Sequence, residues 1–225
     1  MKLYSSIVPG VFRERLNRFT ARVEIQGQTE SVHVKNTGRL RELLLPGAPV
    51  FLQHCEAPQR KTAYDLISVR RQDGALVNID SQSPNKVLGE YLPRLFPDQI
   101  VRPEYTWEDS RFDFKVGDRV LIEVKGVTLL EDEGVARFPD APTIRGVKHI
   151  EGLIRAKSSG WDPYIVFVLA MKGARYFAPN DATHPEFGNA LRRAEQAGVR
   201  ILAFDCLVTS DSLTIDQPVP VKLTL

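Results

Sequence analysis

The hydrophobic period of the chain changes near residue 81, and this change restricts the fold more than any other feature. Residues 11–80 hold short runs in which apolar and polar residues alternate, separated by Gly, Pro and Asn. Such alternation is typical of strands that bury one face. After residue 81, apolar residues recur at helical spacing, beginning with Val87 and Leu88. We therefore expect two domains, over residues 1–80 and 81–225.

Five alternating runs in the first domain predict short antiparallel strands: FTARVEI, SVHVK, APVFLQH, AYDLISVR and ALVNI. In the first run, Phe19 shares its inward face with Ala21. Four or five such strands within about 70 residues indicate a small barrel of the OB kind, although an unspecialised β-barrel fits the same pattern. Between the second and third runs, Leu40, Leu43 and Leu44 fit one helical turn that plugs the barrel.

The second domain predicts helices and strands in the order α-β-β-β-α-β-α-β, so the fold class is mixed α/β. The first helix takes Ser83 or Asn85 as its N-cap. Three successive strands follow, and the second helix ends at Gly160, because glycine readily adopts the left-handed conformation after a helix. The unbroken apolar run YIVFVLAM indicates a central strand that is buried on both faces.

Composition excludes several classes of protein. The chain has 225 residues, of which 43% are hydrophobic and 26% charged, so it can bury a core and is not of the disordered type. No run approaches the ~18 apolar residues of a membrane span, and the N-terminus lacks the apolar segment of a signal peptide. The two cysteines, Cys55 and Cys206, form no C-x-x-C pair. We expect reduced thiols in a cytoplasmic protein that binds no membrane.

Charge is divided unevenly between the two expected domains. Residues 1–80 carry 12 Lys and Arg against 8 Asp and Glu, whereas residues 81–225 carry 18 against 20. The net charges are therefore +4 and −2. A basic module joined to a slightly acidic one suits a protein that holds a polyanion with one part and a cation-dependent site with the other. Ordinary scatter of surface charge is an equally good account.

The stretch SRFDFKVGDRVLIEVKGVTL, residues 110–129, predicts two strands joined by a tight turn. Alternate residues of a strand share a face, so Phe112 and Phe114 should point inward and Asp113 outward. A three-residue turn at Gly117–Arg119 sets the register of the pair. The outward face, which a helix should cover in an α/β fold, is therefore charged.

That register places Asp113 directly beside Glu123. Two carboxylates at opposite positions of a strand pair repel each other. Either Lys125, which lies on the same face as Glu123, or a bound divalent cation must then compensate. For any single acid in this hairpin, a solvated surface position is the ordinary alternative.

These residues and several longer motifs resemble known families. The pattern D…E-V-K at Asp113, Glu123 and Lys125, preceded by a helix that carries Glu90, resembles the PD-(D/E)XK nuclease-like superfamily. The motifs VKNTGRLRELLLPG, SRFDF, IEVKGVTL and FPDAPTIRGVKHIEGL resemble the sugar fermentation stimulation protein A family of bacteria and archaea, over essentially the whole chain. The resemblance implies DNA binding, an N-terminal OB-like domain and a C-terminal nuclease-like domain.

The resemblance also implies a role for each residue of the pattern. Asp113 and Glu123 would supply hard oxygen ligands to Mg²⁺ or Mn²⁺, with the Val124 carbonyl and waters completing an octahedron. Glu90 would not contact the metal directly but would accept a hydrogen bond from a metal-bound water. Lys125 would orient the attacking water or stabilise the phosphorane, although charge neutralisation is an equally good reason for it. The expected catalytic set is Glu90, Asp113, Glu123 and Lys125.

Basic residues in both domains predict contacts with phosphates. In the second expected helix, three basic residues lie at positions i, i+3 and i+4, next to the helix N-terminus. Asp140 precedes this helix, where it is expected to act as the N-cap or, alternatively, as a further acid near the metal. The residues expected to bind nucleic acid are Arg13, Arg15, Arg18, Arg39, Arg145, Lys148 and His149. A solvated face is the alternative for each arginine of the first domain.

Two functions remain. In the first, the chain is a DNA-binding protein, a regulator of sugar-utilisation genes as the family name implies, and its acidic cluster is vestigial or structural. In the second, it is a metal-dependent phosphodiesterase that acts on DNA or RNA. The intact acidic set favours the second, because acids without a metal repel a nucleic-acid backbone. One site cuts one strand, so cleavage of both strands would need a homodimer.

Overall fold

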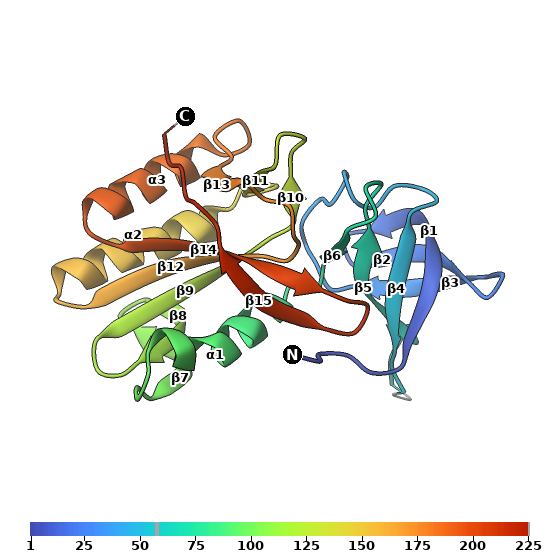
Figure 1. Ribbon diagram of the computed structural model, residues 1–225, viewed down its shortest axis with the longest axis horizontal. Coiled ribbons are helices and arrows are strands. Elements are labelled where there is room, and N and C mark those ends of the chain that lie inside the picture. The colour runs from blue at the N-terminus through green and yellow to red at the C-terminus, as the bar shows by residue number, and fades with distance from the viewer. Residues whose placement is uncertain (57–58, 225) are drawn as a thin grey trace.

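The computed structural model describes residues 1–56 and 59–224. Its N-terminal domain is a closed barrel (Figure 1). Its strands are β1 (Ile7–Asn17), β2 (Thr20–Ile25), β3 (Gln28–Val34), β4 (Pro49–His54), β5 (Tyr64–Arg70) and β6 (Leu76–Asn78). The sheet order is β3-β2-β1-β4-β5-β6, and β3 also pairs with β5 in parallel, which closes a ring of five strands. The expected OB-like barrel is confirmed.

The barrel interior follows the expected alternation with one exception. Inward residues of β2 and β3 such as Val23 and Val32 have no exposed surface. The backbone N–H of Leu44 donates to the Leu40 carbonyl at 2.9 Å, so this turn buries its leucines in the barrel as expected. Phe19 is 52% exposed, because it lies in the turn before β2 and not in the strand.

The C-terminal domain is built on a six-stranded sheet of order β15-β14-β12-β9-β8-β7. Its strands are β7 (Val101–Trp107), β8 (Ser110–Val116), β9 (Val120–Val127), β12 (Asp162–Leu169), β14 (Arg200–Val208) and β15 (Leu213–Pro218). A small second sheet contains β10 (Leu129–Leu130), β11 (Val135–Phe138) and β13 (Tyr176–Pro179). Strand β12 is central and buried along nearly its whole length, as its unbroken apolar run predicts.

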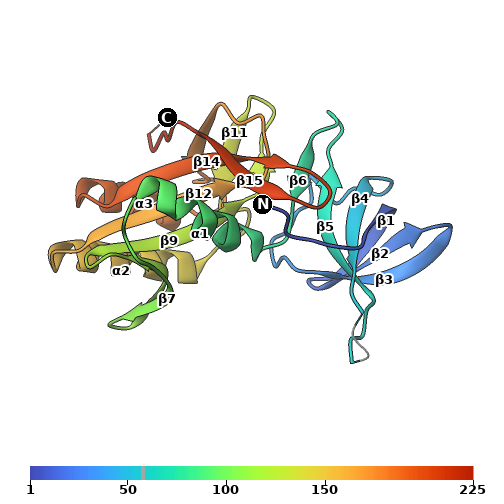
Figure 2. The ribbon, with the colours of Figure 1, turned by 60° about the horizontal axis from the view of Figure 1, so that its bottom comes forward.

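Three helices cover the two faces of this sheet (Figures 1 and 2). Helix α1 (Ser83–Leu95) packs on one face through a core that includes Leu88 and Phe114. Helices α2 (Ile144–Ser158) and α3 (Pro185–Gln196) contact each other and pack on the opposite face. The expected helices and strands occur in the expected order, but β15 at the sheet edge and the short strands β10, β11 and β13 were not predicted. No helix in the described part of the chain is long and apolar enough to cross a membrane.

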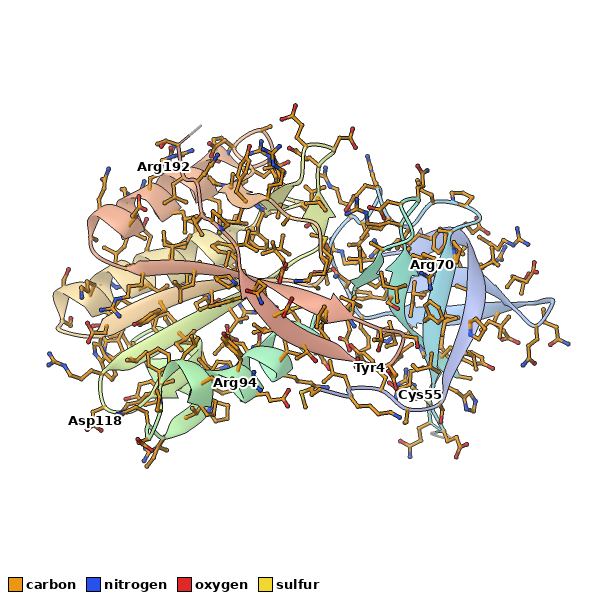
Figure 3. The ribbon with its side chains drawn as sticks, in the orientation of Figure 1. Tyr4, Cys55, Arg70, Arg94, Asp118 and Arg192 are labelled. Carbon is orange, nitrogen blue, oxygen red and sulfur yellow. The ribbon has the colours of Figure 1, made fainter. Side chains whose placement is uncertain are left out.

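A buried polar network around Asp80 joins the two domains. The Asp80 carboxylate accepts hydrogen bonds from Lys35 Nζ of the barrel at 2.8 Å and from the Gln82 backbone N–H at 2.9 Å. It also accepts from the hydroxyl of Tyr4, which Figure 3 labels at the junction of the domains. Lys2 forms a backbone bridge with Ser212. The first residues of the chain therefore lie against the C-terminal domain and help to fix it relative to the barrel.

Candidate functional site

The β8–β9 hairpin has the register that its three-residue turn predicts. Its backbone pairs run from the turn at Gly117, where φ is +54°, to the pair Phe114–Ile122. The next positions in this register are Asp113 and Glu123, but the ladder stops before them. The two strands therefore separate where the two acids lie, toward the end of β9 that faces the barrel (Figure 1).

Strand β8 changes face at Asp113, contrary to the expected alternation. Phe112 packs in the core under α2 and α3, whereas Phe114 packs against α1. On the other side, the ladder with β7 skips Asp113 and its opposite residue Glu104, which has a φ of +53°. The reason is local: a left-handed residue in a strand twists it and breaks the pairing. Asp113 thus lies outside both ladders.

The carboxylate of Asp113 uses this freedom to bind two groups. Its Oδ2 accepts the backbone N–H of Val124 at 2.7 Å, and its Oδ1 accepts Asn85 Nδ2 at 2.6 Å. Burial, followed by the nearby charge of Glu123, raises the pKa of Asp113. The aspartate therefore replaces a backbone pair between β8 and β9 and links them to α1.

The contact from Asn85 corrects the predicted start of α1. Neither Ser83 nor Asn85 is the N-cap, since the helix begins after Gln82, whose side chain makes no capping bond. Ser83 Oγ instead donates to the Asp80 carbonyl at 2.8 Å. The sequence predicts Asn85 as an N-cap because asparagine is common at that position. Only the packing of α1 on the sheet shows that it supports Asp113.

Glu123 is the most deeply buried charged group of the site. Its side chain is 3% exposed, and its Oε1 accepts hydrogen bonds from Lys125 Nζ at 2.5 Å and from His149 Nδ1. Among the described residues, none donates to its Oε2. Burial alone would raise the pKa of Glu123, but the Lys125 charge and the His149 hydrogen bond together lower it. One carboxylate oxygen is thus held firmly, and the other remains without a partner.

Helix α2 divides the predicted basic patch between two environments. Arg145 and Lys148 are exposed, and Lys148 lies 3.3 Å from Asp109. His149 points inward to Glu123, and its Nε2 accepts a hydrogen bond from Arg145 Nε at 3.3 Å. His149 therefore does not share the exposed surface of Arg145 and Lys148, because its ring is buried and both nitrogens are bound. Its place beside Glu123 depends on how α2 crosses β9.

Glu90 does not join the other predicted residues. It lies on α1, its side chain is 53% exposed, and it forms a 3.6 Å ion pair with the amino group of Met1. Five positions separate Glu90 from Asn85, which is about 140° around a helix. Since Asn85 faces Asp113, Glu90 points toward β15 instead. The structure brings together Asp113, Glu123 and Lys125 and leaves Glu90 outside.

The predicted arginines of the barrel differ in their availability. Arg15 is not free to bind a phosphate, because its five N–H groups donate to backbone carbonyls, including those of Asn36 and Gly38. Arg13 is paired with Glu24. Arg18 and Arg39 are exposed, and in the described part of the chain their guanidinium groups have no hydrogen bond or ion pair.

Asp140 contacts the barrel and does not cap α2. The cap is Thr143, whose Oγ1 accepts the backbone N–H of Gly146 at 3.0 Å. Asp140 Oδ2 accepts the backbone N–H of Arg39 at 2.9 Å, across the domain junction. A Cβ atom at Gly38 would lie 2.4 Å from the same oxygen, so this close approach requires glycine. The turn before α2 is therefore fastened to the barrel.

Among the residues described, no group of three or more His, Cys, Asp or Glu side chains is arranged to hold a metal ion. The site instead offers two carboxylates, Asp113 and Glu123, in different protonation environments. Mg²⁺ commonly binds through one or two carboxylates and retains several waters. The unpartnered Oε2 of buried Glu123 is the position in this arrangement that lacks a counter-group.

Comparison with known proteins accounts for the whole chain. The model of the sugar fermentation stimulation protein RE domain matches residues 82–212, and the model of the SfsA N-terminal OB domain matches residues 14–79. Curated sugar fermentation stimulation protein homologs from Desulfitobacterium hafniense and Ruminiclostridium cellulolyticum are 52% and 48% identical. Each alignment covers 98% of this chain, and 98% and 99% of the respective relatives.

A solved structure is similar over the same length. The structure of Pyrococcus furiosus SfsA in complex with Ca²⁺ superposes with a TM-score of 0.87 at 28% identity, and the match covers 99% of both chains. Both domains and their connection are thus present in the relative. This chain belongs to the sugar fermentation stimulation protein (SfsA) family.

Proposed function

We propose that this protein binds DNA and that its C-terminal domain hydrolyses phosphodiester bonds at the Asp113–Glu123 site with the help of Mg²⁺ or Mn²⁺. The observation that carries the proposal is the buried Glu123 carboxylate, whose Oε2 has no partner among the described residues. Leaving a buried carboxylate oxygen unpaired costs free energy, so such an atom is expected where a ligand completes the site.

The donor set fits a hard divalent cation. Glu123 Oε2 and the carboxylate of Asp113 are oxygen ligands of the kind that Mg²⁺, Mn²⁺ and Ca²⁺ accept. The Pyrococcus furiosus relative was solved in complex with Ca²⁺, which is a cation of the same class. When bound, such a cation lowers the pKa of a water molecule and neutralises charge on the scissile phosphate.

The neighbouring side chains prepare the two carboxylates for this role. Lys125 and His149 hold Glu123 through one oxygen and keep it ionised at neutral pH. Asn85 and the Val124 N–H orient Asp113 without neutralising it. Lys125 carries a positive charge and is 13% exposed, so it can approach a phosphate oxygen while it remains bound to Glu123.

Exposed basic residues supply the affinity for DNA in this proposal. Arg18 and Arg39 of the barrel have no acidic partner in the described part of the chain, and Arg145 and Lys148 lie on α2 beside the site. Contacts of this kind neutralise phosphates without reading bases, so binding should weaken as salt concentration rises. The same contacts serve RNA, which the assay below includes.

Binding without cleavage is the second candidate, and one observation favours it. Lys125 and His149 already offset the charge of Glu123, and both oxygens of Asp113 accept hydrogen bonds. The site is therefore held together by protein groups alone. In this case the acids serve to join β8, β9, α1 and α2, and the surface arginines carry the function.

A cleavage assay separates these candidates. Labelled single- and double-stranded DNA and RNA are incubated with EDTA, Mg²⁺ or Mn²⁺ and with wild-type, Asp113→Ala or Glu123→Ala protein. We expect shortened products only with metal and wild-type protein, with losses of at least about 10³-fold in the variants. Glu90→Ala is the matched control, because it removes a predicted acid that lies outside the site, and it should cleave like the wild type.

The opposite result is equally clear. If every substrate stays intact with metal while wild-type protein shifts DNA in the same gel, the protein is a binder and the hydrolysis proposal is wrong. If Glu90→Ala loses cleavage as fully as Glu123→Ala, the assignment of the site to Asp113 and Glu123 is wrong.

A further inference from the structure

A cleft of about 360 Å³ lies between the two domains, lined by residues of both. We call it the interdomain cleft; its lining includes Arg18 and Asn36–Gly38 from the barrel, and Gly126, Thr128 and Phe138–Thr143 from the C-terminal domain. Gly126 follows Lys125 in β9, and Pro84, which also lines the cleft, precedes Asn85 in α1. Two lining residues are therefore chain neighbours of Asn85, which contacts Asp113, and of Lys125, which contacts Glu123.

The walls of the cleft are held in place before any ligand enters. On one side, Lys35 of the barrel is bonded to the buried Asp80. On the other, Asp140 accepts the N–H of Arg39, and Gly38 lies too close to Asp140 to carry a side chain. Because these contacts join the domains on two sides, they fix the width of the cleft in the protein without a ligand. A preformed pocket binds at a smaller entropic cost than one that must assemble.

The size of the cleft selects a small part of a nucleic acid. Ligand pockets typically measure 300–1,000 Å³, and about 360 Å³ is at the lower end of that range. A duplex, whose major groove alone is about 12 Å wide, does not fit between the domains at this point. A single nucleotide removed from base pairing does fit, as in enzymes that bind an extruded base in a pocket.

The chemistry of the lining matches a nucleotide in both of its parts. The guanidinium group of Arg18 has no hydrogen bond or ion pair in the described part of the chain, and it suits a phosphate. Asp140 uses only Oδ2 toward Arg39, and no described donor contacts its Oδ1, which suits an amino or imino group of a base. Phe138 also lines the cleft, and its half-buried ring packs against Phe187.

We infer that the interdomain cleft binds one unpaired nucleotide next to the phosphodiester bond at the Asp113–Glu123 site, so that the preferred substrate is single-stranded or locally unpaired. This inference rests on the proposed function for the position of the bond, but binding in the cleft is measurable without cleavage. It assigns Arg18, Thr37 and Asp140 to substrate recognition.

The test fills the cleft and measures binding in EDTA, where no cleavage occurs. Thr37 is exposed and its hydroxyl makes no hydrogen bond to a described residue, so Thr37→Trp should fold normally while its ring occupies the cleft. The control is Thr29→Trp, a second exposed threonine, which lies in β3 and does not line the cleft. Fluorescence anisotropy reports the Kd for a labelled single strand of about 12 nucleotides and for its duplex.

We expect the wild type to prefer the single strand, and Thr37→Trp to lose at least about tenfold in affinity for it, since stacking and base contacts are each worth that much. Affinity for the duplex should change less than twofold, and Thr29→Trp should match the wild type with both ligands. Asp140→Asn, which keeps an acceptor for the Arg39 N–H, should also weaken single-strand binding. Equal affinity of the wild type for both ligands, or a Thr37→Trp protein that binds the single strand normally, would overturn the inference.

The same variants separate this inference from the proposed function. If the wild type cleaves with metal and Thr37→Trp cleaves and binds equally well, the cleft inference is wrong and the hydrolysis proposal stands. If no protein cleaves but Thr37→Trp loses single-strand binding, the hydrolysis proposal is wrong and the cleft is a binding site.

Discussion

The six-stranded sheet carries two lysine–carboxylate clusters that differ in how completely they are paired. In one, Lys172 donates to both oxygens of Asp205 at 2.9 Å and to Asp216, and the backbone N–H of Gln217 also donates to Asp205. In the other, Lys125 reaches only Glu123, while Asp113 is bound by neutral groups. In the first cluster one lysine pairs with both acids, whereas in the second the lysine pairs with Glu123 and not with Asp113.

The pKa directions follow this difference. Burial lowers the pKa of Lys172, but the hydrogen bonds that it donates to Asp216 and Asp205 outweigh burial and raise the pKa. The same lysine lowers the pKa of Asp216. In the Glu123 cluster, the pKa of Asp113 is raised and that of Glu123 is lowered. Two carboxylates whose environments separate their pKa values are typical of sites that act on a ligand. A cluster in which every charge is paired is typical of a structural role.

Replacing the lysine of each cluster should give the largest difference between them. Lys125→Ala should reduce metal-dependent cleavage about 100-fold, because a charge next to the scissile phosphate is lost. Lys172→Ala should leave the cleavage rate of folded protein within about twofold. It should lower the free energy of unfolding by about 2 kcal/mol, since it leaves the buried Asp205 without a cation. Cleavage rates and urea unfolding measure the two effects, and equal losses of cleavage would remove the distinction between the clusters.

Metal-dependent stability gives a second comparison that does not depend on activity. At a free Mn²⁺ concentration about tenfold above its Kd, binding should stabilise the wild type by about 1.4 kcal/mol and raise Tm by about 4 °C. Glu123→Gln should abolish this shift, because it removes the charge of the unpartnered oxygen. Asp205→Asn should retain it. Differential scanning calorimetry with and without EDTA measures Tm, and an unchanged shift in Glu123→Gln would place the metal elsewhere.

Stability against pH should distinguish the acids of the two clusters by sign. The pKa of Asp113 is raised in the fold, so the folded state binds more protons there, and stability falls as pH rises through the raised value. Above that raised value the penalty is fully present, and Asp113→Asn should increase the free energy of unfolding there by about 1 kcal/mol.

Asp216 provides the opposite case. Its pKa is lowered by the Lys172 hydrogen bond, so its ionised form stabilises the fold above the ordinary aspartate pKa, and this contribution is lost as pH falls through the lowered value. Asp216→Asn should therefore destabilise at pH 7. Urea unfolding in EDTA at pH 7 and at acidic pH tests both signs. A destabilised Asp113→Asn protein at pH 7 would contradict the difference between the clusters.

Part of the candidate site could be predicted from the sequence because it depends on neighbours along the chain. The three-residue turn at Gly117 determined the register of β8 and β9, and with it the approach of Asp113 to Glu123. Alternation along β9 placed Lys125 on the side of Glu123. Turn length and strand period act over a few residues, so a single sequence contains them.

Other residues have surroundings that the sequence did not predict, because a distant element decides their contacts. The spacing of Glu90 along the chain does not show which face of α1 packs on the sheet. That face carries Asn85, which contacts Asp113, and not Glu90. The sequence predicts Arg15 as a surface cation, but its guanidinium donates hydrogen bonds to carbonyls of the turn that follows β3. The sequence predicts His149 as the last residue of a basic patch on α2. The packing of α2 on β9 instead brings His149 into contact with Glu123.

The sequence by itself determined the two kinds of domain, the order of helices and strands and the family to which the chain belongs, since hydrophobic period and turn chemistry are local. Only the tertiary structure decided which charges are paired: it buried Glu123 with one oxygen unpartnered, and it brought Asp140 to the barrel. The physical reason is that desolvation and the choice of hydrogen-bond partner depend on groups far apart in the chain, which meet only when the elements pack.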